Sequence, residues 1–194
     1  MRIKLNQLAT VQMGYSFRSR LDTTAGGGVA VIQMKDLLGD NTVSCDDLVR
    51  IDMEGIKDHH LAQRGDLVFR SRGQVNTAAV LLEDPGKAVV AAPLLRIRVT
   101  NPDKVLPEYL NWFISQRDAQ VFLTSRAKGT VQKMISKHAV EELVIALPSI
   151  EQQLSIVELA ALSAREQFLL DALAMKREQY ISAVLMKIAK GETC

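Results

Sequence analysis

The chain has 194 residues, and its 24 Lys and Arg against 22 Asp and Glu leave a formal net charge of +2. This length accommodates one well-buried domain and one long helix but excludes two full domains. The two cysteines indicate a reducing compartment without a disulfide framework, and no stretch reaches the roughly 18 uninterrupted apolar residues of a membrane span; we therefore expect a soluble, cytoplasmic protein that does not enter a membrane.

Residues 1–148 are predicted to form a mixed α/β domain with many short strands. Apolar and β-branched runs bounded by turn residues predict strands over residues 2–5, 29–34, 48–51, 67–72, 77–82, 88–99 and 143–147. Residues 6–11 are predicted to form one helical turn. A longer helix is predicted over residues 108–124, because Pro107 suits the first helical position and Leu110, Phe113 and Val121 share one face.

The stretch from Leu147 to Lys190 is predicted to be one unbroken helix. Pro148 ends the preceding segment, Ser149 is a candidate N-cap, and Gln152 completes a capping-box pattern. Neither Gly nor Pro follows for about 40 residues, until Gly191 at the expected C-cap. Such a helix would be roughly 60 Å long, which is too long for a small domain to bury.

Two apolar seams with a spacing of three and four residues run along this helix. The first consists of Leu154, Val157, Ala161, Ala164, Phe168, Ala172 and Met175. The second consists of Leu159, Leu162, Leu169, Leu173, Tyr180, Val184 and Ile188. The alternative, an ordinary amphipathic helix lying on its own domain, would need only one stripe. We therefore predict that residues 149–194 form a dimerisation and spacer helix that makes a coiled coil with a partner helix.

Basic residues gather in two segments of this nearly neutral chain. Between Asp118 and Glu141 there is no acidic residue, and the basic residues are Arg126, Lys128, Lys133 and Lys137. The other segment contains Arg64, Arg70 and Arg72, countered only by Asp66. Basic segments of this kind are a weak form of a nucleic-acid footprint, and solvated loops are the alternative explanation.

Five stretches of the chain follow the motif order of one known family. They are Leu8–Thr10 with Gly14–Phe17, Arg64–Gly73, Pro107–Leu110, Gly129–Thr130 with Ile135–Ser136, and Leu147–Gln153 leading into Val157. On these stretches the chain resembles the specificity (S) subunits of type I restriction-modification systems. Each stretch is a weak signal alone, but the ordered set spans nearly the whole chain.

The resemblance implies an α+β fold in which residues 1–148 form a DNA target-recognition domain and residues 149–194 form the spacer helix. S subunits usually carry this pair twice, and their two helices form an antiparallel coiled coil that docks methyltransferase subunits. Because this chain carries one pair, it would be either a half-size subunit that forms a homodimer or a part of a longer one. Two identical recognition domains related by a two-fold axis imply an inverted-repeat DNA target.

The partners implied by the resemblance are double-stranded DNA, methyltransferase (M) subunits and, as a further candidate, a translocase-nuclease (R) subunit. Arginine pairs with guanine in the major groove, and Asn or Gln pairs with adenine. The alternating residues Arg70, Arg72, Gln74 and Asn76 are predicted to face the same way and are the leading base readers. Candidates for phosphate or base contact are Arg18, Arg20, Lys128, Thr130, Gln132 and Lys133. A solvated surface group is the alternative for each.

No catalytic, metal or cofactor site is predicted. The sequence lacks the Asn/Asp-Pro-Pro-aromatic motif and Gly-rich cofactor loop of an adenine methyltransferase. Asp58-His59-His60 has only His138 as a further histidine, which favours a surface loop over a metal site. The first hypothesis is therefore a non-enzymatic DNA-recognition subunit. The alternative is a coiled-coil interaction or inhibitor protein of S-like architecture that does not read DNA.

Overall fold

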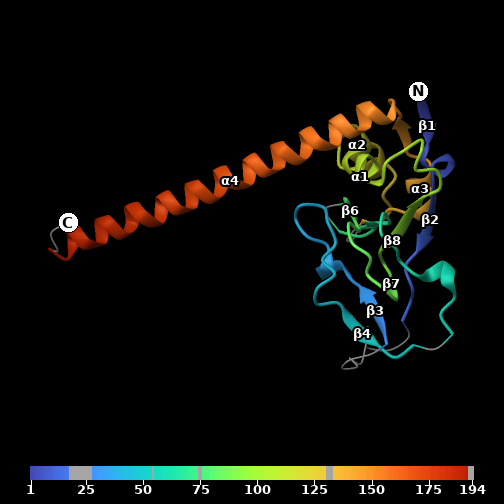
Figure 1. Ribbon diagram of the computed structural model, residues 1–194, viewed down its shortest axis with the longest axis horizontal. Coiled ribbons are helices and arrows are strands. Elements are labelled where there is room, and N and C mark those ends of the chain that lie inside the picture. The colour runs from blue at the N-terminus through green and yellow to red at the C-terminus, as the bar shows by residue number, and fades with distance from the viewer. Residues whose placement is uncertain (18–27, 54, 74–75, 130–132, 192–194) are drawn as a thin grey trace. The chain divides into compact units, whose positions relative to one another are not determined.

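The computed structural model in Figure 1 describes residues 1–17, 28–53, 55–73, 76–129 and 133–191. The chain divides into two compact units, Met1–Ser155 and Ile156–Cys194, and each unit is described by itself. The first unit contains nine strands and three α-helices within the described residues, and the second consists of most of one long helix. The α+β class with many short strands and a long C-terminal helix is confirmed.

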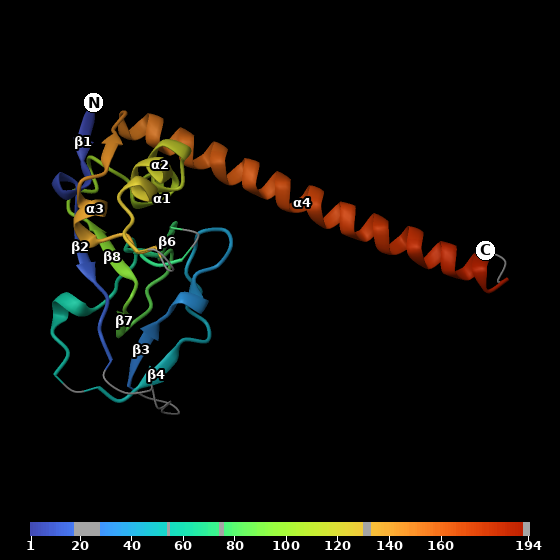
Figure 2. The same cartoon turned by 180° about the vertical axis from the view of Figure 1, so that it is seen from behind.

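The two ends of the first unit pair with each other. Strand β1 (Arg2–Lys4) lies antiparallel to β9 (Val144–Ala146), and Ile3 is opposite Ile145. After β1 the chain forms the 3₁₀ turn Leu5–Gln7, where the Leu5 amide extends the pairing by donating to the Leu143 carbonyl at 2.8 Å. Figures 1 and 2 show β1 at one end of this unit and β4 at the other.

A four-stranded antiparallel sheet has the order β2-β8-β5-β6. Its strands are β2 (Ala9–Met13), β5 (Leu67–Phe69), β6 (Ala78–Val80) and β8 (Leu95–Val99). The predicted helical turn over residues 6–11 is wrong from Ala9 onward, because Ala9 and Val11 alternate with more exposed neighbours and pair with β8. Pairing with a distant strand overrides the local helical pattern.

A three-stranded sheet has the order β4-β3-β7. Its strands are β3 (Val29–Ile32), β4 (Val49–Ile51) and β7 (Ala88–Val90). The single strand predicted over residues 88–99 is two strands, β7 and β8, which belong to different sheets. Pro93 lies between them, and proline cannot donate a ladder hydrogen bond inside a sheet. Both faces of β3 are fully buried.

Three helices pack on the first unit. They are α1 (Pro107–Ile114), which contacts β6, α2 (Arg117–Ser125), and α3 (Lys137–Glu141), which contacts β2. The helix predicted over residues 108–124 is therefore two helices, because Gln116 has an extended backbone. The break changes the buried face of the second half: Ala119 is buried, whereas Val121 is 61% exposed.

The long helix is confirmed as α4 (Ile150–Ala189), which has 40 residues. The predicted capping box is present: the Gln152 amide donates to Ser149 Oγ at 3.3 Å, and the Ser149 amide donates to Gln152 Oε1 at 3.2 Å. At the other end Gly191 has a φ of +74°, a left-handed conformation that suits glycine after a helix. None of the described helices is long and apolar enough to cross a membrane.

Candidate nucleic-acid interface

Two loops that are far apart in the sequence meet beyond the end of β5. The Ile135 amide donates to the Ser71 carbonyl at 2.8 Å, and Arg72 forms an antiparallel bridge with Met134. Met134 also pairs with Lys128, through backbone hydrogen bonds of 2.9 and 2.8 Å. Both predicted basic segments therefore contribute to one location, a juxtaposition that their sequence positions do not reveal.

The anchor of this junction is Ser71, which is buried. Its hydroxyl donates to the carbonyl oxygen of Pro93, which precedes β8. On either side of the junction the chain turns at glycines: Gly73 has a φ of +115° and Gly129 a φ of +112°. Side chains rarely tolerate this backbone region. The junction is therefore fixed to the four-stranded sheet through Ser71.

Three cations lie exposed at this junction: Arg72, Lys128 and Lys133. We call them the Arg72–Lys133 surface. Within the described residues, the ion pairs involve none of the three, and the Arg72 Nε contacts only the Met134 sulfur, at 3.3 Å. Exposed cations without acidic neighbours attract a phosphate backbone.

The other basic residues of the 118–141 interval have partners. The Lys137 ammonium lies 3.5 Å from the Glu141 carboxylate one helical turn away. The Arg126 guanidinium lies 4.8 Å above the Phe122 ring centre. These two cations are less available to an outside ligand than those of the Arg72–Lys133 surface.

The prediction that Arg70, Arg72 and Asn76 face the same way is wrong. Strand β5 ends at Phe69, so strand alternation does not extend into the loop. Arg70 Nη2 donates to the Leu37 carbonyl at 2.6 Å, and the buried Asn76 donates through Nδ2 to the Arg70 carbonyl at 2.9 Å. Arg70 and Asn76 therefore stabilise the loop, and only Arg72 of these three presents its side chain outward.

The remaining predicted contact residues lie outside the described residues. They are Arg18, Arg20, Gln74, Thr130 and Gln132. Their assignment as base or phosphate contacts stays a prediction.

A buried ionic cluster holds the segment that leads into β5. Asp66 is 1% exposed and accepts two hydrogen bonds of 2.7 Å from Nε and Nη2 of Arg98. The Leu61 carbonyl accepts from Arg96 Nη1 at 2.6 Å and from Arg98 Nη2 at 2.8 Å. The sequence suggested that Asp66 counters the charges of Arg64, Arg70 and Arg72. In the structure its carboxylate instead pairs with the arginines of β8. The alternation Arg96-Ile97-Arg98 was the sequence signal that could have revealed this cluster.

The same cluster fixes the protonation of His60. Arg96 Nη2 donates to Gln12 Oε1 at 2.6 Å, so the other end of the Gln12 amide is its NH₂ donor. That NH₂ lies 2.9 Å from His60 Nδ1, which must then be an unprotonated acceptor. His60 is thus neutral and carries its proton on Nε2. A proton on Nδ1 would require the Gln12 amide to turn its NH₂ toward the Arg96 guanidinium.

Acid is expected to weaken the fold through His60. Burial lowers the pKa of His60 below its ordinary value of 6.5, and the neighbouring cationic groups His59, Arg96 and Lys57 lower it further. The folded state therefore binds fewer protons than the unfolded state between the two pKa values, so stability rises with pH. The loss begins as the pH falls through about 6.5 and is complete below the folded-state pKa.

The check on this pH effect is urea unfolding between pH 5 and 8. His60→Gln should flatten the pH dependence near pH 6, whereas the control His138→Gln, which removes an exposed histidine, should not. Equal pH profiles for wild type and His60→Gln would contradict the assigned neutral state.

Comparison with known proteins identifies the family. The family model of the type I restriction modification DNA specificity domain matches residues 1–163. The chain belongs to this family. The resemblance inferred from the ordered motifs is thereby confirmed, and the family is defined by DNA specificity and not by catalysis, as expected. No curated protein sequence matches the chain.

Solved structures show where the fold of this specificity domain recurs. Similar chains come from a study of complex assembly and conformational transition of the type I R-M system (20% identity, TM-score 0.64), the HsdS subunit of Thermoanaerobacter tengcongensis (20%, 0.58), and the type I S subunit of M. genitalium (13%, 0.57). They cover 97%, 92% and 92% of this chain, which spans only 43%, 39% and 42% of theirs. At these identities the likeness is one of fold.

The first turn of α4 is anchored to the specificity domain by Gln153, which is completely buried. Its Oε1 accepts from the Leu106 amide at 3.0 Å, and its Nε2 donates to the carbonyls of Lys104 and Pro148 at 2.9 and 3.0 Å. Gln153 ends one of the motif stretches, and the sequence alone did not reveal this role.

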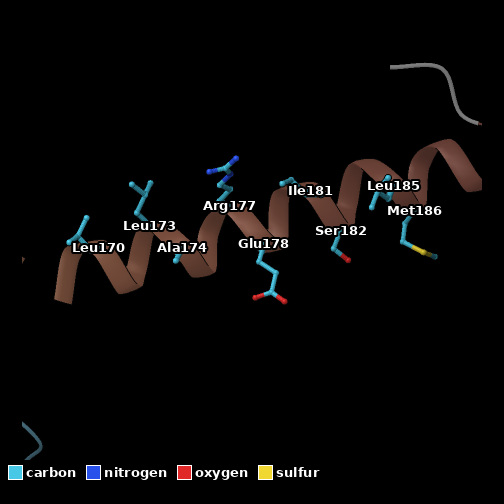
Figure 3. Close-up of a pocket in the computed structure, with 9 residues that line it drawn as sticks. All are labelled: Leu170, Leu173, Ala174, Arg177, Glu178, Ile181, Ser182, Leu185 and Met186. Atoms are coloured by element: carbon cyan, nitrogen blue, oxygen red, sulfur yellow. The ribbon is translucent and has the colours of Figure 1, made fainter. Parts of the chain in front are cut away.

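Beyond Ser155 most apolar residues of α4 are exposed in the single chain. Leu159, Phe168 and Leu173 are 69%, 61% and 65% exposed. Of the predicted seam residues, Val157, Ala172 and Val184 are half-buried and the others beyond Ser155 are exposed. An apolar groove also includes Leu170, Ile181 and Leu185, which the two predicted seams left out. Figure 3 shows Leu173 and Arg177 on one side of the helix and Glu178 and Ser182 on the other.

Proposed function

We propose that this chain is the DNA-sequence-recognition subunit of a type I restriction-modification complex and reads one half of a bipartite DNA site. The observation that carries the proposal is the Arg72–Lys133 surface in a chain of the DNA specificity family. Two loops bring three exposed cations together, and no described acidic residue pairs with them. Such a surface suits phosphate contact, and its arginine suits a guanine edge.

Within this surface we assign different roles to arginine and lysine. Arg72 can donate two parallel hydrogen bonds to guanine O6 and N7, which gives sequence discrimination. Lys128 and Lys133 are point charges that suit phosphate oxygens and give affinity without discrimination. Buried Ser71 supports the reading role of Arg72, because its contacts with Ile135 and Pro93 fix the backbone next to the arginine.

We further propose that two copies assemble through α4 and that the helix pair docks methyltransferase subunits; a complete complex would add a translocase-nuclease subunit. The two seams support this proposal. Leu159 and Phe168 are nine residues apart, which is about two and a half helical turns, so they lie on opposite sides of α4. The leucine-rich second seam suits helix pairing, which leaves the first seam free for another subunit.

Binding to specific and random duplexes tests the DNA-reading proposal. In the chain assembled with its methyltransferase subunit, Arg72→Ala is expected to relax base preference at one position, at a cost of about 1–3 kcal/mol. Lys133→Ala should weaken binding to all sequences alike and lower the log–log salt slope by about 1. The control is Lys35→Ala, at an exposed lysine outside the surface.

If Arg72→Ala and Lys133→Ala lost equal binding affinity on specific and random duplexes, the assignment of base discrimination to Arg72 and phosphate contact to Lys133 would be wrong. If the assembled wild-type complex bound no duplex at low salt, the alternative would hold: an interaction or inhibitor protein that keeps the specificity fold without reading DNA.

A further inference from the structure

A recess lies on the first unit, and none of the residues of the Arg72–Lys133 surface lines it. Its volume is about 530 Å³, and aromatic rings from two helices line it: Trp112 and Phe113 of α1 and Phe122 of α2. Strand β9 contributes Val144, whose side chain is 44% exposed. We call this recess the α1–α2 pocket. Its volume is typical of binding sites, which range from about 300 to 1,000 Å³.

The walls of the α1–α2 pocket are held in place from behind. Tyr109 is 2% exposed, and its ring centre lies 5.6 Å from that of Trp112 and 6.1 Å from that of Phe113. The Tyr109 hydroxyl donates to the Ala146 carbonyl at 2.5 Å, which ties α1 to β9. The pocket is therefore preformed, and its half-buried rings leave apolar surface open to an outside group.

The lining of this apolar recess carries more positive than negative charge. Arg2 and Arg117 line it and are exposed, and Asp118 is the one acidic residue in its described lining. The first turn of α2 also lines it, and Gln116 at the N-cap makes no capping bond, because its amide donates to the Trp112 carbonyl. The uncapped N–H groups add the positive end of the helix dipole to the two arginines.

The charges decide between the macromolecules that could occupy the pocket. The C-terminal turn of a second copy's α4 is unsuitable, because Lys187 and Lys190 would face the two arginines. DNA would satisfy the arginines but not the aromatic walls, since paired bases expose no apolar group large enough to fill the recess. A peptide with an apolar side chain flanked by carboxylates satisfies both the walls and the rim.

We propose that the α1–α2 pocket binds an acidic segment of a partner protein. An apolar or aromatic side chain of that segment lies between Trp112, Phe113 and Phe122, and its carboxylates lie near Arg2 and Arg117. In the proposed complex this partner is the methyltransferase subunit, so the inference rests on the proposed function. It adds a contact on the recognition domain to the one proposed for α4.

Calorimetric titration of the full chain with its methyltransferase subunit tests this contact. Arg117→Glu is expected to weaken binding at least tenfold, and the loss should be larger at low salt because the contact is charge-dependent. Arg50→Glu makes the same charge change at an exposed site on β4 and should bind like wild type. Both positions are exposed, so thermal unfolding should show both variants to be as stable as wild type.

Photo-crosslinking identifies the occupant directly. A benzoylphenylalanine at position 144, in the exposed β9 wall, should crosslink to a methyltransferase peptide rich in Asp and Glu. Unchanged binding by Arg117→Glu, or a crosslink only to DNA or to the second copy, would overturn the pocket assignment and leave the proposed function standing. Failure of the wild-type chain to bind the methyltransferase subunit at all would overturn both.

Discussion

Replacing Asp66 with alanine is expected to lower the free energy of unfolding by about 3–5 kcal/mol. The substitution removes the carboxylate that accepts two hydrogen bonds from Arg98 and lies 3.8 Å from Arg96 Nε. The Arg96 side chain is only 7% exposed and would keep its charge without a counter-ion. Arg96 Nε has no hydrogen-bond partner in the described structure, so nothing there would replace the charge of the carboxylate.

Urea unfolding at neutral pH measures this effect. The matched control is Asp47→Ala, which removes an exposed carboxylate from the same unit and should change stability by less than about 0.5 kcal/mol. A loss below 1 kcal/mol for Asp66→Ala would show that water or local rearrangement compensates the two arginines, and the ionic cluster would then not be the anchor of the segment before β5.

The second large effect is expected on assembly. Leu169→Glu combined with Leu173→Glu should convert a homodimer into monomers, because both side chains lie on the second seam and are 51% and 65% exposed in the single chain. A fully buried leucine contributes about 1.5–3 kcal/mol, so losing two from each chain should weaken association at least 100-fold. Introducing four glutamates across the helix pair adds charge repulsion.

Analytical ultracentrifugation over a range of protein concentrations measures this dissociation. The control Gln167→Glu adds negative charge at an exposed position outside both seams and should leave the dimer intact. A dimer that persists in the leucine variant would show that the second seam is not the pairing surface. A monomeric wild type at every concentration would contradict the homodimer itself.

Local sequence signals predicted the long helix and the residues that cap it. The capping pair Ser149 and Gln152 and the terminal Gly191 each act within a few residues of their positions, so sequence order is enough to find them. The spacing that defines the two seams is equally local, and the pairing role of the seam residues stays a prediction. The role of Gln153 was not predictable, because its partners Lys104 and Leu106 are nearly 50 residues away.

The sequence indicated which basic segments form the candidate interface, but not how their side chains are arranged. Arg70 and Arg72 are equivalent in the sequence pattern, yet the Leu37 carbonyl engages Arg70 and leaves Arg72 exposed. The bridge from Arg72 to Met134 joins residues 62 positions apart, and no local rule gives it. The sequence therefore identified the basic segments, while tertiary contacts decide which of their side chains are available to DNA.

We propose that this chain specifies a DNA sequence, and the methylation pattern of a host genome would show this directly. The host would express the neighbouring methyltransferase gene with or without this chain. A bipartite motif with inverted-repeat half-sites should be methylated only when the chain is present, and Arg72→Ala should relax one of its positions. If the methyltransferase is active with another S subunit and no motif depends on this chain, the claim of DNA specificity is contradicted.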